Sequence, residues 1–201
     1  GWKTLYGTKP EYIEQDVMRM RHLKMGAMPP KGDPVTGRVV LFGNSDVEMA
    51  MCVPAEKMDY FFKNAMGDEC IFVHEGSGTL ETIFGDVPYK EGDYIVIPRG
   101  TTYRFDPKGA QRYLVFETPG LIEIPRRYRN EYGQIVEGAP FYHRDIHPPT
   151  ELRTHRETGE FLVKVRVRGG MQDYVLDYHP FDVVGWDGYL FPWTFSIHDF
   201  E

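Results

Sequence analysis

Three side chains near residue 145 have the types and the spacing of a small metal site. His143, Asp145 and His147 alternate along one short segment, and two histidines with one carboxylate form the facial triad of non-haem Fe(II) oxygenases. If the segment is a strand, alternate residues share one face and the three side chains can converge. Prolines flank the segment and Arg144 lies inside it, which favours a solvated loop. We therefore keep this triad only as the alternative to a chain that binds no metal.

A second set of chemically competent residues lies in two spaced fragments in the middle of the chain. The first fragment, residues 69–76, begins with Glu69 and ends with a glycine, and the second, residues 92–103, ends with Tyr103. Their spacing resembles the two motifs of the cupin family, G-x5-H-x-H-x3/4-E-x6-G and G-x5-P-x-G-x2-H-x3-N. The glutamate, the glycines and the proline of these motifs are present. This resemblance implies a small β-barrel in which Glu69 and Tyr103 face the interior.

The residues that would bind a metal in a cupin are replaced here. The positions of the histidine pair hold, in the two possible alignments, Phe62 with Asn64 or Lys63 with Ala65. The last histidine position holds Tyr103, so Glu69 is the one motif ligand left, whereas zinc and iron sites need three or more convergent ligands. We therefore expect a packed barrel with a polar contact between Glu69 and Tyr103, no bound metal and no catalytic residue.

The elements that must position these residues are short strands. The chain has 13 Tyr, 13 Phe, 21 Gly and 15 Pro, and apolar runs alternate with glycine-rich turns. This pattern predicts a mostly all-β fold, a cupin or jelly-roll-like antiparallel β-sandwich with an irregular N-terminal strap and the start of a second sheet. The expected units are the strap (1–34), a degenerate cupin-like barrel (35–120), an irregular connecting arm (121–158), and strands that lead toward a further cupin half (159–201).

Composition excludes several classes of partner. The formal net charge is −7, which disfavours binding to nucleic acid or to an anionic membrane surface. No apolar run reaches the roughly 20 residues that span a bilayer. The two cysteines, Cys52 and Cys70, lie in apolar segments, as expected for reduced core thiols. We therefore expect a cytoplasmic protein.

Three stretches of the chain resemble the homogentisate 1,2-dioxygenase family, specifically its N-terminal and linking region. They are residues 67–100, 113–141 and 180–193. The resemblance implies an extradiol-type enzyme of tyrosine and phenylalanine catabolism, which opens homogentisate to maleylacetoacetate with Fe(II) and O2. It also implies a trimer-based homo-oligomer and a small aromatic acid as substrate. In that family two histidines and a glutamate of the C-terminal cupin half bind the iron, and no position of this chain matches them.

Three functional hypotheses follow from these patterns. The chain is a structural part of such a dioxygenase, without bound iron of its own. Alternatively, it is a non-enzymatic cupin-like module that binds a small molecule near Glu69 and Tyr103. The third hypothesis is a self-contained Fe(II) enzyme that uses His143, Asp145 and His147.

Overall fold

The computed structural model of the chain describes residues 3–6, 19–183 and 188–200, and these are nearly all β. The strands are β1 (Lys3–Tyr6), β2 (Arg38–Gly43), β3 (Glu48–Cys52), β4 (Phe61–Asn64), β5 (Asp68–Thr82), β6 (Gly85–Lys90), β7 (Asp93–Ile97), β8 (Thr102–Thr118), β9 (Ile146–His147), β10 (Thr158–Val167), β11 (Gly170–Tyr178) and β12 (Trp193–Ser196). Short 3-10 helices are η1 (Met25–Ala27), η2 (Arg126–Tyr128), η3 (His143–Asp145) and η4 (Ile197–Asp199).

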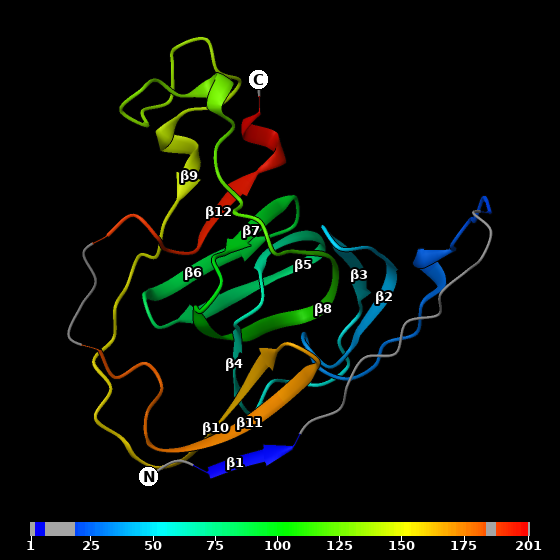
Figure 1. Ribbon diagram of the computed structural model, residues 1–201, viewed down its shortest axis with the longest axis vertical. Coiled ribbons are helices and arrows are strands. Elements are labelled where there is room, and N and C mark those ends of the chain that lie inside the picture. Colours follow the sequence, from blue (N-terminus) through cyan, green and yellow to red (C-terminus); the bar gives the residue numbers. More distant parts are fainter. Residues whose placement is uncertain (1–2, 7–18, 184–187, 201) are drawn as a thin grey trace.

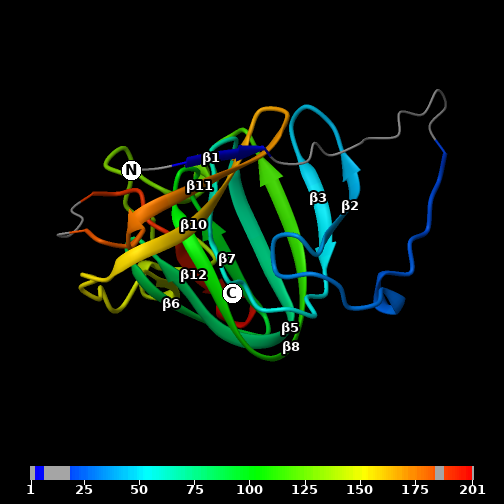
Figure 2. The same cartoon turned by 90° about the horizontal axis from the view of Figure 1, so that it is seen from below.

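Two long antiparallel strands, β5 and β8, organise the barrel. They pair over their whole length, from Asp68 opposite Thr118 to Thr82 opposite Tyr103 (Figure 2). One half of this pair is extended by β3, β7 and β12, and the other half by β4 and β6. Because both long strands bend, the two halves face each other and enclose the core. The predicted mostly all-β, cupin-like fold is confirmed.

The bend replaces a turn that the sequence pattern indicated. Gly76-Ser77-Gly78 has turn composition, but these residues continue β5 through two register shifts near Glu75. Gly76 has φ +102°, and a Cβ there would collide with the side chain of Gln111, so only glycine fits comfortably. The glycine therefore bends a continuous strand instead of ending it.

Aromatic rings fill the space between the two halves. Tyr89, Phe105 and Tyr113 contact one another edge-on or tilted, and the hydroxyls of Tyr89 and Tyr113 are 2.8 Å apart. Phe62 packs edge-on against Tyr103, and all five rings are buried. The interior of the barrel is thus occupied by side chains from both layers.

The later strands return to the barrel. β10 and β11 form a hairpin that β1 extends, and β10 pairs with β4 in parallel, with Val163 opposite Phe61 (Figure 1). This parallel pair departs from the purely antiparallel sandwich that we expected. The sequence predicted the start of a second sheet here, but hydrogen bonds between β10 and β4 make the hairpin part of the same sheet as the barrel. β12 pairs with β7, so the last described strand also belongs to the barrel unit.

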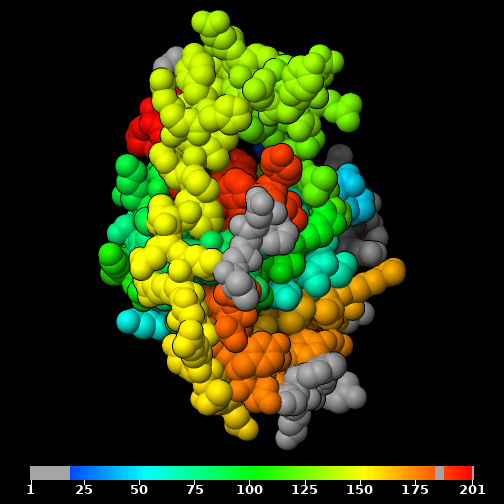
Figure 3. Space-filling model, turned by 90° about the vertical axis from the view of Figure 1, so that its left-hand side faces the viewer, coloured from blue at the N-terminus to red at the C-terminus, as the bar shows by residue number. Residues whose placement is uncertain are grey.

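The connecting arm lies along one outer face of the molecule. Figure 3 shows it as a yellow band that descends to the orange hairpin. Within the arm, β9 pairs with β12, and Glu151 bridges to Asp86 of β6. Much of the predicted strap, residues 1–2 and 7–18, lies outside the described residues, and the boundaries of the four units stay predictions. Among the described helices none is long and apolar enough to cross a membrane.

Candidate functional site

The barrel interior contains a fully buried charged group at the position of the predicted site. Along β5 the residues Glu69, Ile71 and Val73 alternate inward, which places the Glu69 carboxylate inside the barrel. The hydroxyl of Tyr103 on β8 donates to Glu69 Oε2 at 2.7 Å. This confirms the predicted polar contact, and both side chains have 0% exposure.

A guanidinium that the sequence pattern did not indicate completes this group. Arg38, at the start of β2, forms an ion pair with Glu69 Oε1 and donates to the Tyr103 hydroxyl at 3.1 Å. Its guanidinium carbon also lies 5.8 Å from the centroid of the Phe62 ring. Phe62 stands at one of the former histidine positions. Arg38 therefore supplies the positive charge that neutralises the buried Glu69 carboxylate.

The electrostatics of the group are consistent with a permanent ion pair. Burial opposes the charge on Arg38, but Glu69 and Tyr103 more than offset this, so the pKa of Arg38 is raised well above its usual range. Burial and the adjacent Glu69 carboxylate also raise the pKa of Tyr103 well above its ordinary value. Tyr103 therefore stays a neutral hydrogen-bond donor and cannot serve as a base near neutral pH.

Strand register extends the charged group into a row of three carboxylates. Glu48 on β3 and Glu69 on β5 are both direct cross-strand partners of Glu117 on β8, so the three side chains lie side by side on one face. Adjacent like charges are unfavourable, and two arginines compensate them. Arg38 pairs with Glu69, while Arg166 of β10 lies 3.4 Å from Glu117 and 3.5 Å from Glu48.

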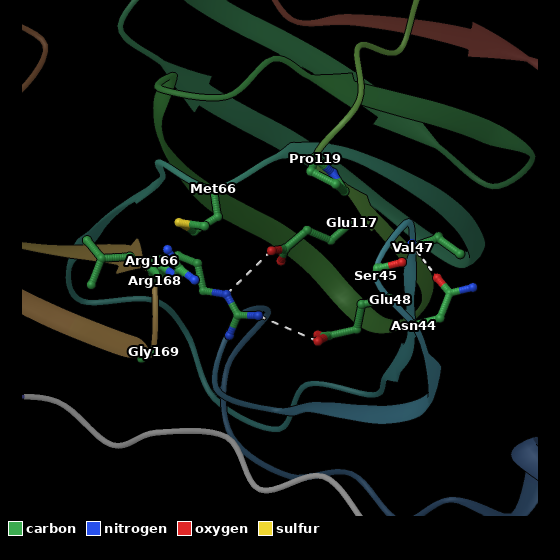
Figure 4. Close-up of a pocket in the computed structure, with 12 residues that line it drawn as sticks. Asn44, Ser45, Val47, Glu48, Met66, Glu117, Pro119, Arg166, Arg168 and Gly169 are labelled. Carbon is green, nitrogen blue, oxygen red and sulfur yellow. Dashed lines mark hydrogen bonds and ion pairs between the residues drawn. The ribbon is translucent and has the colours of Figure 1, made fainter. Parts of the chain in front are cut away.

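The outer end of the row lines a pocket of about 320 Å³. Figure 4 shows Arg166 between Glu117 and Glu48, with the loop at Asn44 and Ser45 on the other side. Three carboxylates against two guanidiniums leave one negative charge if every group is ionised. Burial, followed by the neighbouring Glu69 and Glu48, raises the pKa of Glu117, although Arg166 acts in the opposite direction. Glu117 therefore takes up a proton more readily than a glutamate in water does.

The former histidine positions on β4 do not provide metal ligands. Phe62 is apolar, and Asn64 is almost fully buried, with its Oδ1 accepting the backbone N–H groups of Met66 and Gly67. Asn64 Nδ2 has no hydrogen-bond partner among the described residues. With Glu69 already paired to Arg38, these side chains do not fit Fe(II) at this position.

The proposed triad of His143, Asp145 and His147 has a different geometry from the one that its spacing predicted. His143 to Asp145 form the 3-10 helix η3, and β9 begins only at Ile146, so the three residues do not alternate along one strand face. His143 Nε2 accepts the backbone N–H of Ile135 at 3.1 Å. Asp145 accepts the backbone N–H of Tyr142 and lies 3.5 Å from Arg144.

Each group of the triad therefore has a local structural partner or faces outward. His147, on β9, is exposed. In the part of the chain that the structure describes, no three His, Cys, Asp or Glu side chains form a cluster that could hold a metal ion. The strand geometry expected for the triad is wrong, because His143 and Asp145 lie in the 3-10 helix η3 and His147 lies in β9.

A family model described as homogentisate 1,2-dioxygenase N-terminal matches residues 14–197. Among curated proteins, "Putative dioxygenase SSO1533" of Saccharolobus solfataricus is 41% identical over 90% of this chain and 47% of its own length. Homogentisate 1,2-dioxygenase of Rhodopseudomonas palustris is 29% identical over 74% of this chain and 32% of its own length. The chain thus spans half or less of the length of these relatives.

Two of the solved structures that resemble the chain are described as cupin proteins. One is a cupin superfamily protein of Desulfitobacterium hafniense, with 13% identity and a TM-score of 0.42, which covers 52% of this chain and 95% of that protein. Another is a cupin-2 domain protein of Shewanella frigidimarina, with 18% identity and a TM-score of 0.37, over 40% of this chain and 78% of the other.

Proposed function

Because the chain belongs to the homogentisate 1,2-dioxygenase N-terminal family, we propose that it is the supporting, non-catalytic part of a dioxygenase. The whole protein would open the ring of a homogentisate-like aromatic acid with O2 and Fe(II), in the breakdown of tyrosine and phenylalanine. Its iron ligands would belong to the part of the longer relatives that this chain does not span. We further propose a cytoplasmic, trimer-based homo-oligomer.

The observation that carries the supporting role is the Arg38–Glu69 ion pair inside the barrel. A metal ion at this position would need the Glu69 carboxylate as a ligand, whereas here a guanidinium neutralises it. Phe62 and Tyr103 fill the space next to the pair, and both are fully buried. The barrel interior is thus a packed core, which suits a part of the protein that stabilises the fold and does not bind substrate.

Iron and oxygen measurements on the 201-residue chain test this proposal. Equilibrium dialysis against Fe(II) without oxygen, followed by an oxygen-electrode assay with homogentisate, should give neither stoichiometric iron nor oxygen uptake. The Rhodopseudomonas enzyme serves as the positive control in the same assay. Stoichiometric iron together with oxygen uptake by the chain alone would overturn the supporting role. Loss of both in His143→Ala would then assign the chemistry to the segment around η3.

The runner-up function, a small-molecule binding module, is tested in parallel by thermal shift with a panel of aromatic acids. The geometry disfavours a ligand at Glu69 and Tyr103, because both side chains are fully buried and already paired. We therefore expect no stabilisation by any acid of the panel. A saturable rise in melting temperature that Tyr103→Phe removes would favour the binding module instead.

A further inference from the structure

Two histidine rings from distant parts of the chain are stacked against each other. His155, near the end of the connecting arm, and His179, just after β11, have ring centroids 3.8 Å apart and ring planes within 3° of parallel. His179 is 7% exposed, and the side chain of His155 is also largely buried. The stack joins the lower end of the arm to the β10–β11 hairpin, where the yellow and orange segments meet in Figure 3.

An aromatic cage holds the stack on its hairpin side. Phe61, Phe161 and Phe181 each meet the His179 ring edge-on, with centroids 5.1 to 5.4 Å away. These rings are part of the small apolar cluster between β4 and the hairpin. An imidazole in such surroundings packs well while it is neutral, because a charge there loses its hydration.

A hydrogen bond determines which ring nitrogen carries the proton in neutral His179. The backbone N–H of Phe181 donates to His179 Nδ1 at 3.1 Å, so this nitrogen is the acceptor and the proton of the neutral ring lies on Nε2. A second proton must therefore be added at Nδ1. Protonation of His179 thus breaks the bond with Phe181 and also places a positive charge in the apolar cage.

The charged groups around the stack further oppose protonation of His179. Arg104 of β8 lies 4.8 Å from the centroid of the Phe61 ring, and Glu81 of β5 pairs with it at 2.7 Å. On the arm, Glu157 lies 3.4 Å from His155 Nδ1. A proton on His179 would lie directly beside the His155 ring, whose centroid is 3.8 Å away. Burial and the neighbouring His155 lower the pKa of His179, although Glu157 raises it in part.

A shared metal ion does not explain this pair. Nitrogen lone pairs point outward in the plane of each imidazole, and two nearly parallel rings therefore have lone pairs that do not converge on one ion. No third ligand joins the two histidines in the described part of the chain.

We propose that the His155–His179 stack is a pH-sensitive latch, which fastens the end of the arm to the hairpin and opens when His179 takes up a proton. The inference is independent of the proposed dioxygenase role. When the latch opens, the arm remains attached at a second anchor, where Asp86 exchanges backbone hydrogen bonds with Thr150 and Glu151. Release should therefore be confined to the few residues around His155.

Hydrogen–deuterium exchange of peptides that cover residues 152–157 tests the latch. After correction for the intrinsic exchange rate, exchange should be about 10-fold faster at about pH 4.5 than at about pH 7.5, because the pKa of His179 lies below the ordinary histidine value of about 6.5. His179→Phe keeps a stacked ring but cannot take up a proton, so this variant should stay protected at acidic pH. His147→Gln, which changes an exposed histidine of the same arm, should respond to pH as the wild type does.

The Asp86–Arg153 ion pair is the main competing explanation, since burial raises the pKa of Asp86 and acid would weaken the pair. If His179→Phe loses protection in acid as the wild type does, the latch is wrong and the Asp86 anchor is the sensitive element. NMR titration of the wild-type histidine rings gives a second measurement that needs no variant. His179 should titrate below the ordinary histidine range, and titration within that range would also overturn the proposal.

Discussion

Replacing Arg38 by methionine should destabilise the protein strongly, although Arg38 lies at the start of a barrel-edge strand. Methionine preserves most of the unbranched stem but removes the guanidinium. Glu69 would then be a carboxylate with 0% exposure whose described hydrogen bond comes from Tyr103. A buried charge without its counter-ion is one of the few single defects with a large cost.

The expected cost can be set from general magnitudes. Removing one partner of a buried ion pair costs about 3–5 kcal/mol, against a total stability of about 5–15 kcal/mol for a domain. With a urea slope of about 2 kcal/mol per M, the midpoint of unfolding should fall by about 2 M. In folded Arg38→Met the buried Glu69 carboxyl should bind a proton that the same group in the unfolded chain releases. The free energy of unfolding of the variant should therefore rise by about 1.4 kcal/mol for each pH unit as the pH falls from about 7.

Urea unfolding followed by circular dichroism at about pH 7 and about pH 5 measures both effects. Arg129→Met is the matched control, because Arg129 pairs with Glu123 at 2.7 Å but the Glu123 side chain is 51% exposed. Its loss should cost less than about 1 kcal/mol at either pH. The double variant Arg38→Met, Glu69→Gln removes the unpaired charge and should recover much of the stability.

Two results would refute this reasoning. If Arg38→Met costs no more than Arg129→Met, the Arg38–Glu69 pair does not neutralise a buried charge. If the cost is large but independent of pH and unchanged in the double variant, packing of the arginine stem explains it.

Further predictions concern the same interior. Burial raises the pKa of Glu117, so the wild-type protein loses stability as the pH rises from the ordinary glutamate pKa of about 4.3 toward the raised value. The free energy of unfolding of Glu117→Gln, measured with urea, should therefore increase relative to that of the wild type between about pH 4.5 and about pH 7.5. A difference that does not change with pH would contradict this. Tyr103→Phe removes the hydroxyl that donates to Glu69 and accepts from Arg38, and it should lower the free energy of unfolding by about 1–3 kcal/mol. A loss below about 0.5 kcal/mol would show that the hydroxyl is dispensable. Burial raises the pKa of Cys52 to about 12 and that of Cys70 to about 11. Iodoacetamide at about pH 8 should therefore label neither thiol until the chain unfolds, as followed by mass spectrometry. Rapid labelling of either thiol in the native protein would contradict this prediction.

Local patterns predicted the parts of the fold that depend on single residues. Gly92 and Gly100 have φ of +87° and +81°, and β7 ends just before Pro98, as the spacing of the second fragment required. The extent of β5 and β8 could not be predicted in this way. A glycine at position 76 is equally compatible with a tight turn and with a bend in a continuous strand. Which of the two forms depends on pairing with β8, which the local sequence does not show.

The candidate site could also be predicted only in part from local sequence patterns. The positions of Glu69 and Tyr103 followed from motif spacing, whereas Arg38 lies outside both motif fragments and nothing in its immediate sequence marks it as buried. The alignment of Glu48 with Glu117 depends on strand register, where a slip of one residue would turn a side chain to the opposite face. Register is set by the packing of the whole barrel.

The pairing of β12 with β7 has a consequence for the biosynthesis of the protein. Val96 is opposite Trp193, so about 100 residues separate the two strands in the chain. A ribosome adds about 5–20 residues per second, and the outer edge of β7 therefore waits roughly 5–20 s for its partner. During this interval its unpaired N–H and C=O groups can pair with other nascent chains. Late completion of the sheet therefore leaves the edge of β7 open to intermolecular pairing until the residues of β12 have been synthesised.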